Sequence, residues 1–312
     1  MIYDIIIVGS GPAGVTAAIY ACRAKKSVLV IEKEAFGGMI THSPKVENYP
    51  GYDSISGVAL ADKFVGQAMD LGVRFEFDNV LEIKKNENDL FIAKGEYNTY
   101  EGKTVILATG SKHRTLKLEN EEKLVGKGIS YCAVCDGPFY TNQDVAIVGG
   151  GNSAMQEALL LASYCKSVTI IQNLGFFTGE HALKEQIEKT ENIKVMFNKV
   201  VVGLIGSTSL ESIVLKDQVT SETEVFNTTS LFVAIGQEAN NKPFENIAKL
   251  NEQGFIETDE MCNTFVEGVF AAGDVRNPKY KQAVISAGSG AMAAMDAIEF
   301  LEANRWCYND II

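Results

Sequence analysis

The sequence predicts an α/β protein built from two copies of one βαβ unit, and three observations lead to this prediction. Residues 4–32 and 144–172 align without a gap, at an offset of 140. Each copy consists of an apolar strand, a glycine-rich turn, an amphipathic helix and a second strand, which is the pattern of a βαβ unit. A further apolar strand that ends in glycine follows each copy, at 104–110 and at 230–236. We therefore expect an α/β fold with two Rossmann-like dinucleotide-binding domains, each with three layers.

Two polar segments separate the expected domains along the chain. The stretches "SKHRTLKLENEE" at 111–122 and "QEANNKPFENIA" at 237–248 are typical of a pair of crossings between domains. The second domain is then inserted into the first. The expected first domain is discontinuous, with residues 1–115 and 245–312, and the expected second domain spans residues 116–244.

The composition excludes several classes of function. The chain has 312 residues, of which 46% are hydrophobic and 22% charged, which is typical of a globular protein with two domains. A formal charge of -12 argues against nucleic acid and an anionic membrane as partners, because both need a basic face. No basic stretch, apolar core and cleavage site precede the first strand, and no run of about 18 uninterrupted apolar residues occurs. We therefore expect a cytoplasmic protein without a membrane partner.

The first glycine motif has the spacing of a dinucleotide-binding turn. Gly9 permits the tight turn, Gly11 lets the backbone approach a pyrophosphate, and Gly14 lets the helix pack on the strand. Glu32 stands at the end of the following strand, where a carboxylate accepts hydrogen bonds from a ribose. This combination predicts that the first domain binds an adenine dinucleotide.

The second glycine motif keeps the phosphate end of such a site and changes the ribose end. Gly149, Gly151 and Ala154 repeat the glycine spacing, whereas Gln172 replaces the acid that NAD recognition usually uses. The following "NLGFFTG" contains no Arg or Lys for the additional phosphate of NADP. Either Gln172 binds a ribose weakly, or this domain keeps the fold without using the cofactor.

A close cysteine pair, Cys132 and Cys135, lies between the two copies in "YCAVCDGPFY". Two cysteines at this spacing form a redox-active disulfide or contribute to a metal site. Zinc needs about four ligands, so the scattered remaining cysteines and histidines make a metal site improbable. Asp136 beside the pair is either a turn residue or the acid that donates a proton during thiol exchange. The scattered residues are Cys22, Cys165, Cys262, Cys307, His42, His113 and His181.

Five segments occur in one order along almost the whole chain: the first glycine motif, "GGMITHSPKVENYPG", "ILATGS", "CAVCDG" and "GVFAAGDVRNPKYKQAVISAGSGAMAAMDAIEFL". In this order they resemble the low-molecular-weight thioredoxin reductases. The cysteine pair in the second domain distinguishes this group from the lipoamide and glutathione reductases, whose pair lies in the first. The resemblance implies a homodimer that carries FAD on the first domain and reduces thioredoxin.

The resemblance also implies roles for individual residues. Cys135 faces the flavin, Cys132 attacks the thioredoxin disulfide, and Asp136 is the acid. The implied FAD residues lie in the first domain: Gly9, Gly11, Pro12, Ala13, Gly14, Glu32, Gly38, Asn48, Thr109, Gly110, Asp274, Gln282 and Ala283.

The chain departs from the NADPH-dependent members at the ribose end of the second domain. Those members have a His-Arg-Arg cluster where this chain has Gln172, Asn173 and Leu174. In this it resembles the ferredoxin-dependent flavin thioredoxin reductases, which implies reduced ferredoxin as the electron donor. The alternatives are an NADPH-dependent thioredoxin reductase with an atypical ribose pocket and, from another class, a redox-sensing flavoprotein that works as a binding module.

Two further segments suggest interactions. Trp306 and Tyr308 lie in a C-terminal tail that either covers a flavin face or packs on the surface or on a dimer partner. Arg276, Lys279 and Lys281 form either a basic patch on which an acidic ferredoxin docks or a solvated loop.

Overall fold

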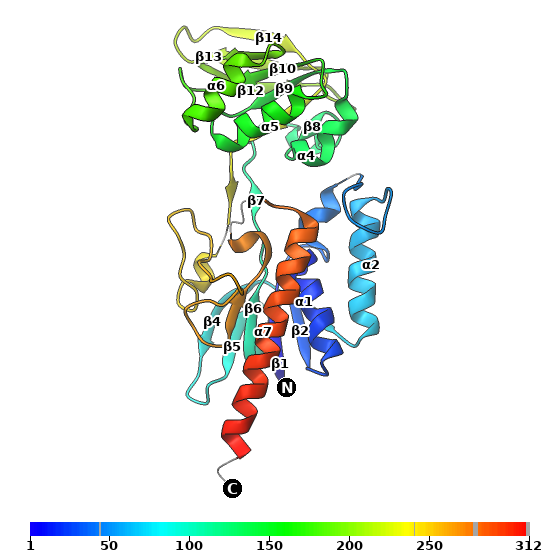
Figure 1. Ribbon diagram of the computed structural model, residues 1–312, viewed down its shortest axis with the longest axis vertical. Helices are drawn as coiled ribbons and strands as arrows, with labels where there is room; N and C mark the ends of the chain where they lie inside the picture. The colour runs from blue at the N-terminus through cyan, green and yellow to red at the C-terminus, as the bar shows by residue number, and fades with distance from the viewer. Residues whose placement is uncertain (44, 240, 277–279, 310–312) are drawn as a thin grey trace. The chain divides into compact units, whose positions relative to one another are not determined.

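The protein is described here from a computed structural model, whose chain splits into two compact units (Figure 1). Unit 1 contains Met1–Lys112 and Glu238–Ile312, and unit 2 contains His113–Gln237. Its two boundaries lie close to the sequence-based ones, at 115 and 244. The structure describes residues 1–43, 45–239, 241–276 and 280–309, and describes side chains as far as Ala303.

Unit 1 is built around a mixed sheet in the order β3-β2-β1-β6-β5-β4, with β17 also paired to β6. The strands β3, β2, β1, β6 and β17 pair in parallel, whereas β4 and β5 form an antiparallel extension. The elements are β1 (Ile2–Val8), α1 (Pro12–Arg23), β2 (Val28–Glu32), η1 (Gly38–His42), α2 (Gly57–Asp70), β3 (Arg74–Phe77), β4 (Val80–Lys85), β5 (Phe91–Gly95), β6 (Thr99–Leu107), η3 (Lys242–Phe244), β17 (Val269–Ala271), η4 (Gly273–Arg276) and α7 (Ala283–Asn309).

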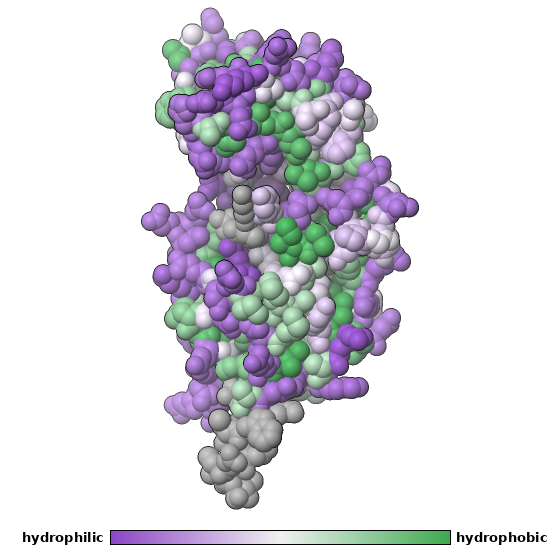
Figure 2. All heavy atoms as spheres, viewed as in Figure 1, coloured by the Kyte–Doolittle hydropathy of each residue, from purple (hydrophilic) through white to green (hydrophobic). Residues whose placement is uncertain are grey.

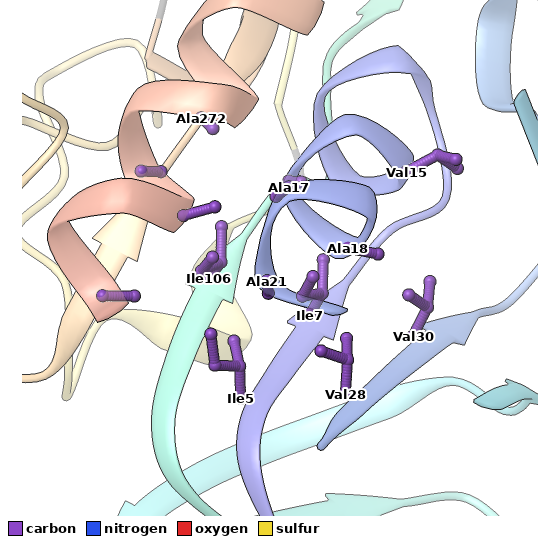
Figure 3. Packing of buried hydrophobic residues seen from close by; sticks show 14 of the residues in the cluster. Ile5, Ile7, Val15, Ala17, Ala18, Ala21, Val28, Val30, Ile106 and Ala272 are labelled. Atoms are coloured by element: carbon purple, nitrogen blue, oxygen red, sulfur yellow. The ribbon is translucent and has the colours of Figure 1, made fainter. Parts of the chain in front are cut away.

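The sheet of unit 1 is buried on both faces, which explains its nearly continuous apolar strands. Successive residues of β1 alternate between two clusters, with Ile5 and Ile7 on the helix side and Ile6 and Val8 on the other side. On the helix side, aliphatic strand residues meet the small residues of α1 (Figure 3). The labelled residues are Ile5, Ile7, Val15, Ala17, Ala18, Ala21, Val28, Val30, Ile106 and Ala272.

Helix α7 packs along α1 through small residues (Figure 1). A Cβ on Gly290 would collide with the backbone of Ala13, so a larger residue would force the two helices apart. Residues Ala283–Ala303 are apolar and long enough to cross a membrane by length and composition, but a buried core helix has the same properties. Because α7 contributes Ala293, Ala294 and Leu301 to the core, we interpret it as such a helix.

Unit 2 repeats the Rossmann-like architecture with a parallel sheet in the order β11-β10-β9-β15-β8. One apolar cluster lies between this sheet and α5, and another includes the antiparallel sheet β12-β13-β14. The elements are α3 (Glu121–Leu124), β8 (Ile129–Ser130), α4 (Ala133–Asp136), η2 (Gly137–Tyr140), β9 (Asp144–Val148), α5 (Asn152–Ala162), β10 (Ser167–Ile171), α6 (His181–Lys189), β11 (Ile193–Met196), β12 (Lys199–Ile205), β13 (Ser212–Asp217), β14 (Thr223–Asn227) and β15 (Leu231–Val233).

The two chain segments that connect the units are short strands, β7 (Lys112–His113) and β16 (Gln237–Glu238), which pair with each other. The parallel sheets of the two units, with their helices, confirm the predicted α/β fold with two Rossmann-like domains. Figure 2 shows hydrophilic residues over much of the visible face. Two apolar residues in the first turn of α7, Val284 and Ile285, are exposed.

Candidate active site

The cysteine pair of unit 2 forms a disulfide at the start of α4. Cys132 and Cys135 have Cα atoms 5.3 Å apart, which is within the usual range for a disulfide. The backbone N–H of Cys135 donates to the Cys132 sulfur at 3.2 Å, and both residues are partly exposed. Among the described residues, no group of three or more His, Cys, Asp or Glu side chains is arranged to hold a metal ion. This geometry fits a redox-active pair.

Asp136 lies at the end of the same short helix, beside the disulfide. Ser130 donates a hydrogen bond to its carboxylate at 2.6 Å and accepts one from the backbone N–H of Cys132 at 3.1 Å. Burial raises the pKa of Asp136 above its usual range, and the Ser130 hydrogen bond opposes this shift. A half-buried carboxyl group whose pKa is raised in this way is suited to act as an acid near the sulfur atoms.

A cavity of about 570 Å³ lies in unit 1, at the carboxyl ends of the parallel strands. The glycine turn and the start of α1 line one side of it, and Glu32, at the end of β2, lines another. Most of the predicted FAD residues surround this cavity: Gly9, Gly11, Pro12, Ala13, Glu32, Gly38, Thr109, Gly110 and Asp274.

Four predicted FAD residues do not line the cavity. Gly14 packs α1 against the glycine turn, because a Cβ there would collide with the carbonyl of Gly9. Asn48 donates a hydrogen bond to Gln282 at 3.2 Å, which joins two distant parts of the chain. Ala283 is the first residue of α7. Gly14 therefore supports the glycine turn that lines the cavity, whereas Asn48, Gln282 and Ala283 are not among its lining residues.

Sequence reasoning missed several residues that line the cavity. Asp78, Asn79 and Val80 come from the junction of β3 and β4, and Ser286 comes from the first turns of α7. Ser286 donates a hydrogen bond to Asp274 at 3.0 Å, and burial raises the pKa of Asp274. No local motif marks these residues, and only the folded sheet brings them to the glycine turn.

The space beside Gly11 fits a bound pyrophosphate. A Cβ on Gly11 would have no protein atom closer than the Gly37 carbonyl oxygen, at 4.0 Å, so this space is open. Gly9 has φ of 105°, which favours glycine, and no side chain caps the N-terminus of α1. The backbone N–H groups at a helix N-terminus attract phosphate, so the donors and the space match a dinucleotide.

Glu32 is fixed by its neighbours at the ribose end of this cavity. One of its oxygens accepts from the backbone N–H and the hydroxyl of Ser10, both at 2.9 Å. The other accepts from the backbone N–H groups of Lys33 at 2.8 Å and Glu34 at 2.9 Å. These donors hold a carboxylate in place, and a ribose hydroxyl would share an oxygen with them.

Gln172 occupies the corresponding position in unit 2, and its side-chain amide bonds to the loop that follows it. Its side-chain amide donates to the carbonyl of Phe176 at 3.0 Å and accepts from the N–H of Asn173 at 3.1 Å. Gln172 is buried, and a Cβ on Gly150 would collide with its amide. The amide group is therefore satisfied without a ligand.

The loop after Gln172 lies on the start of α5. Thr178 donates from its backbone N–H to the carbonyl of Gly150 at 2.8 Å, and Glu180 exchanges hydrogen bonds with Asn152. Lys199 donates its backbone N–H to the carbonyl of Gln172, but its ammonium group lies between Asp217 at 3.2 Å and Glu224 at 2.8 Å. This nearby cation is therefore already paired with two carboxylates.

The expected basic patch has other contacts. Arg276 donates to the hydroxyl of Thr258 at 2.6 Å, to the sulfur of Cys262 at 2.8 Å and to the carbonyl of Asp259 at 2.8 Å. Lys281 lies over the ring of Phe255, 4.6 Å from its centre. Arg276 and Lys281 thus have structural contacts within unit 1, because tertiary partners unseen in the local sequence bind them. Lys279 lies outside the described residues.

The predicted aromatic tail continues α7, which extends to Asn309. At 1.5 Å per residue, the backbone of Trp306 lies roughly 30 Å along the helix from Ser286 at the cavity. The side chains of Trp306 and Tyr308 lie outside the described residues, so their expected contact with a flavin stays a prediction.

Comparisons with known proteins agree with this combination of a dinucleotide cavity and a disulfide. The chain belongs to the pyridine nucleotide-disulphide oxidoreductase family, whose description matches residues 3–290. Proteins of this family and its thioredoxin reductases are FAD-binding flavoproteins.

Individual relatives narrow this class. The chain is 36% identical to the thioredoxin reductase of Bacillus subtilis, over 96% of this chain and 95% of the relative. It is 38% identical to the "34.2 kDa protein in rubredoxin operon" of Clostridium pasteurianum, over 96% and 97% of the two chains. The crystal structure of thioredoxin reductase from Streptococcus pyogenes matches with a TM-score of 0.92 and 35% identity, covering 97% of this chain and 99% of that one. The chain is thus of the low-molecular-weight thioredoxin reductase type.

Proposed function

We propose that this protein is a FAD-dependent thioredoxin reductase that takes its electrons from reduced ferredoxin. Electrons pass through the flavin and the pair Cys132–Cys135 to the disulfide of thioredoxin. The observation that carries the proposal is the disulfide itself, which lies beside the half-buried carboxyl group of Asp136 in a chain that also has a cavity suited to a dinucleotide.

The cavity of unit 1 is the proposed FAD site. The N-terminus of α1 and the open space at Gly11 bind the pyrophosphate, and Glu32 holds the ribose. Asp274 and Thr109 line the same cavity, and Thr109 is fixed by a hydrogen bond to Asn241 at 2.9 Å. When bound and reduced by two one-electron transfers from the donor, FAD would supply the two electrons that convert the disulfide to a dithiol.

The reduced cysteine pair then exchanges with thioredoxin. The Cys132 thiolate attacks one thioredoxin sulfur, which breaks the thioredoxin disulfide and forms a mixed disulfide. The displaced thioredoxin sulfur takes a proton from Asp136. Cys135 next attacks the Cys132 sulfur, its own proton goes to the second thioredoxin sulfur, and the disulfide Cys132–Cys135 forms again. Two electrons and two protons thus reach thioredoxin.

Support for ferredoxin as the donor comes from residues 172–180 of unit 2, which offer neither a carboxylate at position 172 nor an Arg or Lys for a nucleotide ribose or its phosphate. Gln172 bonds within its own loop, and residues 173–180 contain no Arg or Lys. Lys199 beside this loop is paired with two carboxylates. A relative is named for its place in a rubredoxin operon, which supports a one-electron protein carrier as the source of electrons.

The second candidate is an NADPH-dependent thioredoxin reductase with an atypical ribose pocket. Unit 2 favours it in one respect, because Gly149, with φ of 138°, and Gly151 retain the phosphate-binding turn at the start of α5. A redox-sensing binding module is a further alternative, and sustained turnover of thioredoxin would exclude it. We also propose a homodimer, as the family resemblance implies, and a cytoplasmic location, as the sequence pattern predicts.

Cysteine variants test the proposed route of electrons. We expect Cys132→Ser and Cys135→Ser each to lose thioredoxin reduction, because either change removes the disulfide. If Cys135 faces the flavin, only Cys132→Ser leaves a thiolate beside it, which gives a long-wavelength charge-transfer absorbance band. Cys165→Ser is a matched control, since Cys165 is a buried free cysteine of the same unit. Full turnover by either pair variant would contradict the proposal.

A further inference from the structure

A second carboxyl group, that of Glu157, interacts with the backbone of Ala133, the residue that follows Cys132. Glu157 lies on α5, and α5 packs against α4, the short helix that contains Cys135. The backbone N–H of Ala133 hydrogen-bonds the Glu157 carboxyl group. Because Ala133 directly follows Cys132, Glu157 contacts the backbone on which the attacking sulfur is carried.

Ala133 is held from a second direction by Tyr164. The Tyr164 hydroxyl donates to the Ala133 carbonyl at 3.3 Å, and Ala133 is 1% exposed. The same hydroxyl occupies the space in which a Cβ on Gly137 would lie, so Gly137 lets the tyrosine reach α4. Both polar groups of one buried residue are thus bound by side chains from α5 and the turn after it.

We propose that Glu157 is a positioning residue for the redox pair: with Tyr164 it holds Ala133, and its carboxyl group adjusts the balance between disulfide and dithiol. This inference rests on the proposed exchange at Cys132 and Cys135. Asp136 is the acid that serves the sulfur atoms, whereas Glu157 acts through the backbone and through its charge.

The charge of Glu157 depends on pH in the range where the enzyme works. Burial raises the pKa of Glu157 to about 7, and the Ala133 hydrogen bond opposes the shift. Burial, and after it the charges of Cys165 and Glu157, raise the pKa of Tyr164. Several titratable groups lie on the elements packed against α5 and on the turn after it. They are Asp136 and, once the pair is reduced, Cys135 on α4; Tyr164, Cys165 and Lys166 on the turn; Asp144 on β9; Lys194 on β11; and His181, Lys184, Glu185, Glu188 and Lys189 on α6.

The sign of the effect follows from these charges. Above its pKa, the ionised Glu157 repels a thiolate in the reduced pair and so favours the disulfide. Below its pKa, the neutral carboxyl group lacks this effect. Glu157→Gln keeps an oxygen that accepts from Ala133 but stays neutral at every pH, so it separates charge from hydrogen bonding.

The experiment measures the disulfide–dithiol equilibrium of the full-length FAD-loaded protein against a glutathione buffer, by thiol labelling. Measurements at about pH 6 and about pH 8 bracket the pKa of Glu157, about 7. For Glu157→Gln we expect an approximately fivefold shift toward the dithiol at the higher pH and less than a twofold change at the lower pH. Glu188→Gln, an exposed acid on α6, is the control and should not shift either value.

Two further variants keep the proposal testable. Tyr164→Phe removes the hydrogen bond to the Ala133 carbonyl and should change the equilibrium at both pH values. An equal shift of Glu157→Gln at both pH values, or no shift at either, would overturn the proposal. A different result would contradict the proposed function itself: thioredoxin turnover by a variant that lacks Cys132 or Cys135. The two failures can therefore be told apart.

Discussion

The two βαβ copies share a backbone design, and an informative difference between them is the buried side chain at the end of the second strand. In unit 1, Glu32 accepts hydrogen bonds from Ser10, the residue between the first two glycines. In unit 2, Gln172 lies at the matching position and packs against Gly150, the residue that corresponds to Ser10. The carboxylate lines an open cavity, whereas the amide bonds the carbonyl of Phe176. The same fold thus supports a ligand site in one copy and an internally satisfied loop in the other.

Among the changes that test this comparison, we expect the largest effect from replacing Glu32, the acid of unit 1. Glu32→Gln would turn an N–H group toward backbone donors and remove the charged ribose acceptor. We expect FAD to bind at least about tenfold more weakly, as the loss of one buried charged hydrogen bond predicts. Flavin retention during dialysis measures this change.

The exposed acid Glu87 of unit 1 offers a control for that experiment. Glu87→Gln should keep the FAD content of the wild type. Unchanged FAD affinity in Glu32→Gln would remove Glu32 from the proposed site and abolish the contrast between the two copies.

Addition of cations to unit 2 should produce a smaller gain. The combined change Asn173→Arg, Leu174→Arg and Thr178→Arg supplies guanidinium groups where residues 173–180 have none. Arginine binds phosphate with two parallel hydrogen bonds, so we expect NADPH to bind about tenfold more tightly, with no such gain for NADH. Fluorescence titration with both nucleotides measures the difference, and an equal gain for NADH would contradict recognition of the additional phosphate.

The reverse exchange, Gln172→Glu, should destabilise unit 2 and create no ribose site. Its carboxylate would face the carbonyl of Phe176 without the hydroxyl donor that Ser10 supplies in unit 1. We expect a loss of about 1–3 kcal/mol in the free energy of unfolding, as for other unsatisfied buried groups. Burial raises the pKa of such a group in the folded state, so the loss should grow as pH rises above the unfolded value. Urea unfolding at two pH values measures the free energy of unfolding of Gln172→Glu relative to the wild type. The same loss at both pH values would contradict this explanation.

The two glycine turns and the cysteine pair could be predicted from the sequence, because each is defined by the spacing of a few neighbouring residues. The lining residues Asp78 and Asn79 could not, since they reach the glycine turn only through the pairing of β3 with β2. Arg276 looked like a surface cation because its local sequence is polar, but its partner Thr258 lies 18 positions away. The sequence did not mark Glu157 as a neighbour of the cysteine pair, because an acid on an amphipathic helix is normally exposed to solvent.

We propose that electrons enter the flavin from a protein donor and that unit 2 does not recognise a pyridine nucleotide. An anaerobic titration of the oxidised protein with NADPH and NADH, followed by reduced ferredoxin, tests it directly through the flavin absorbance. We predict that neither nucleotide bleaches the flavin, that ferredoxin does, and that added thioredoxin then restores the absorbance. Rapid bleaching by micromolar NADPH would contradict the claim and identify the protein as an NADPH-dependent thioredoxin reductase.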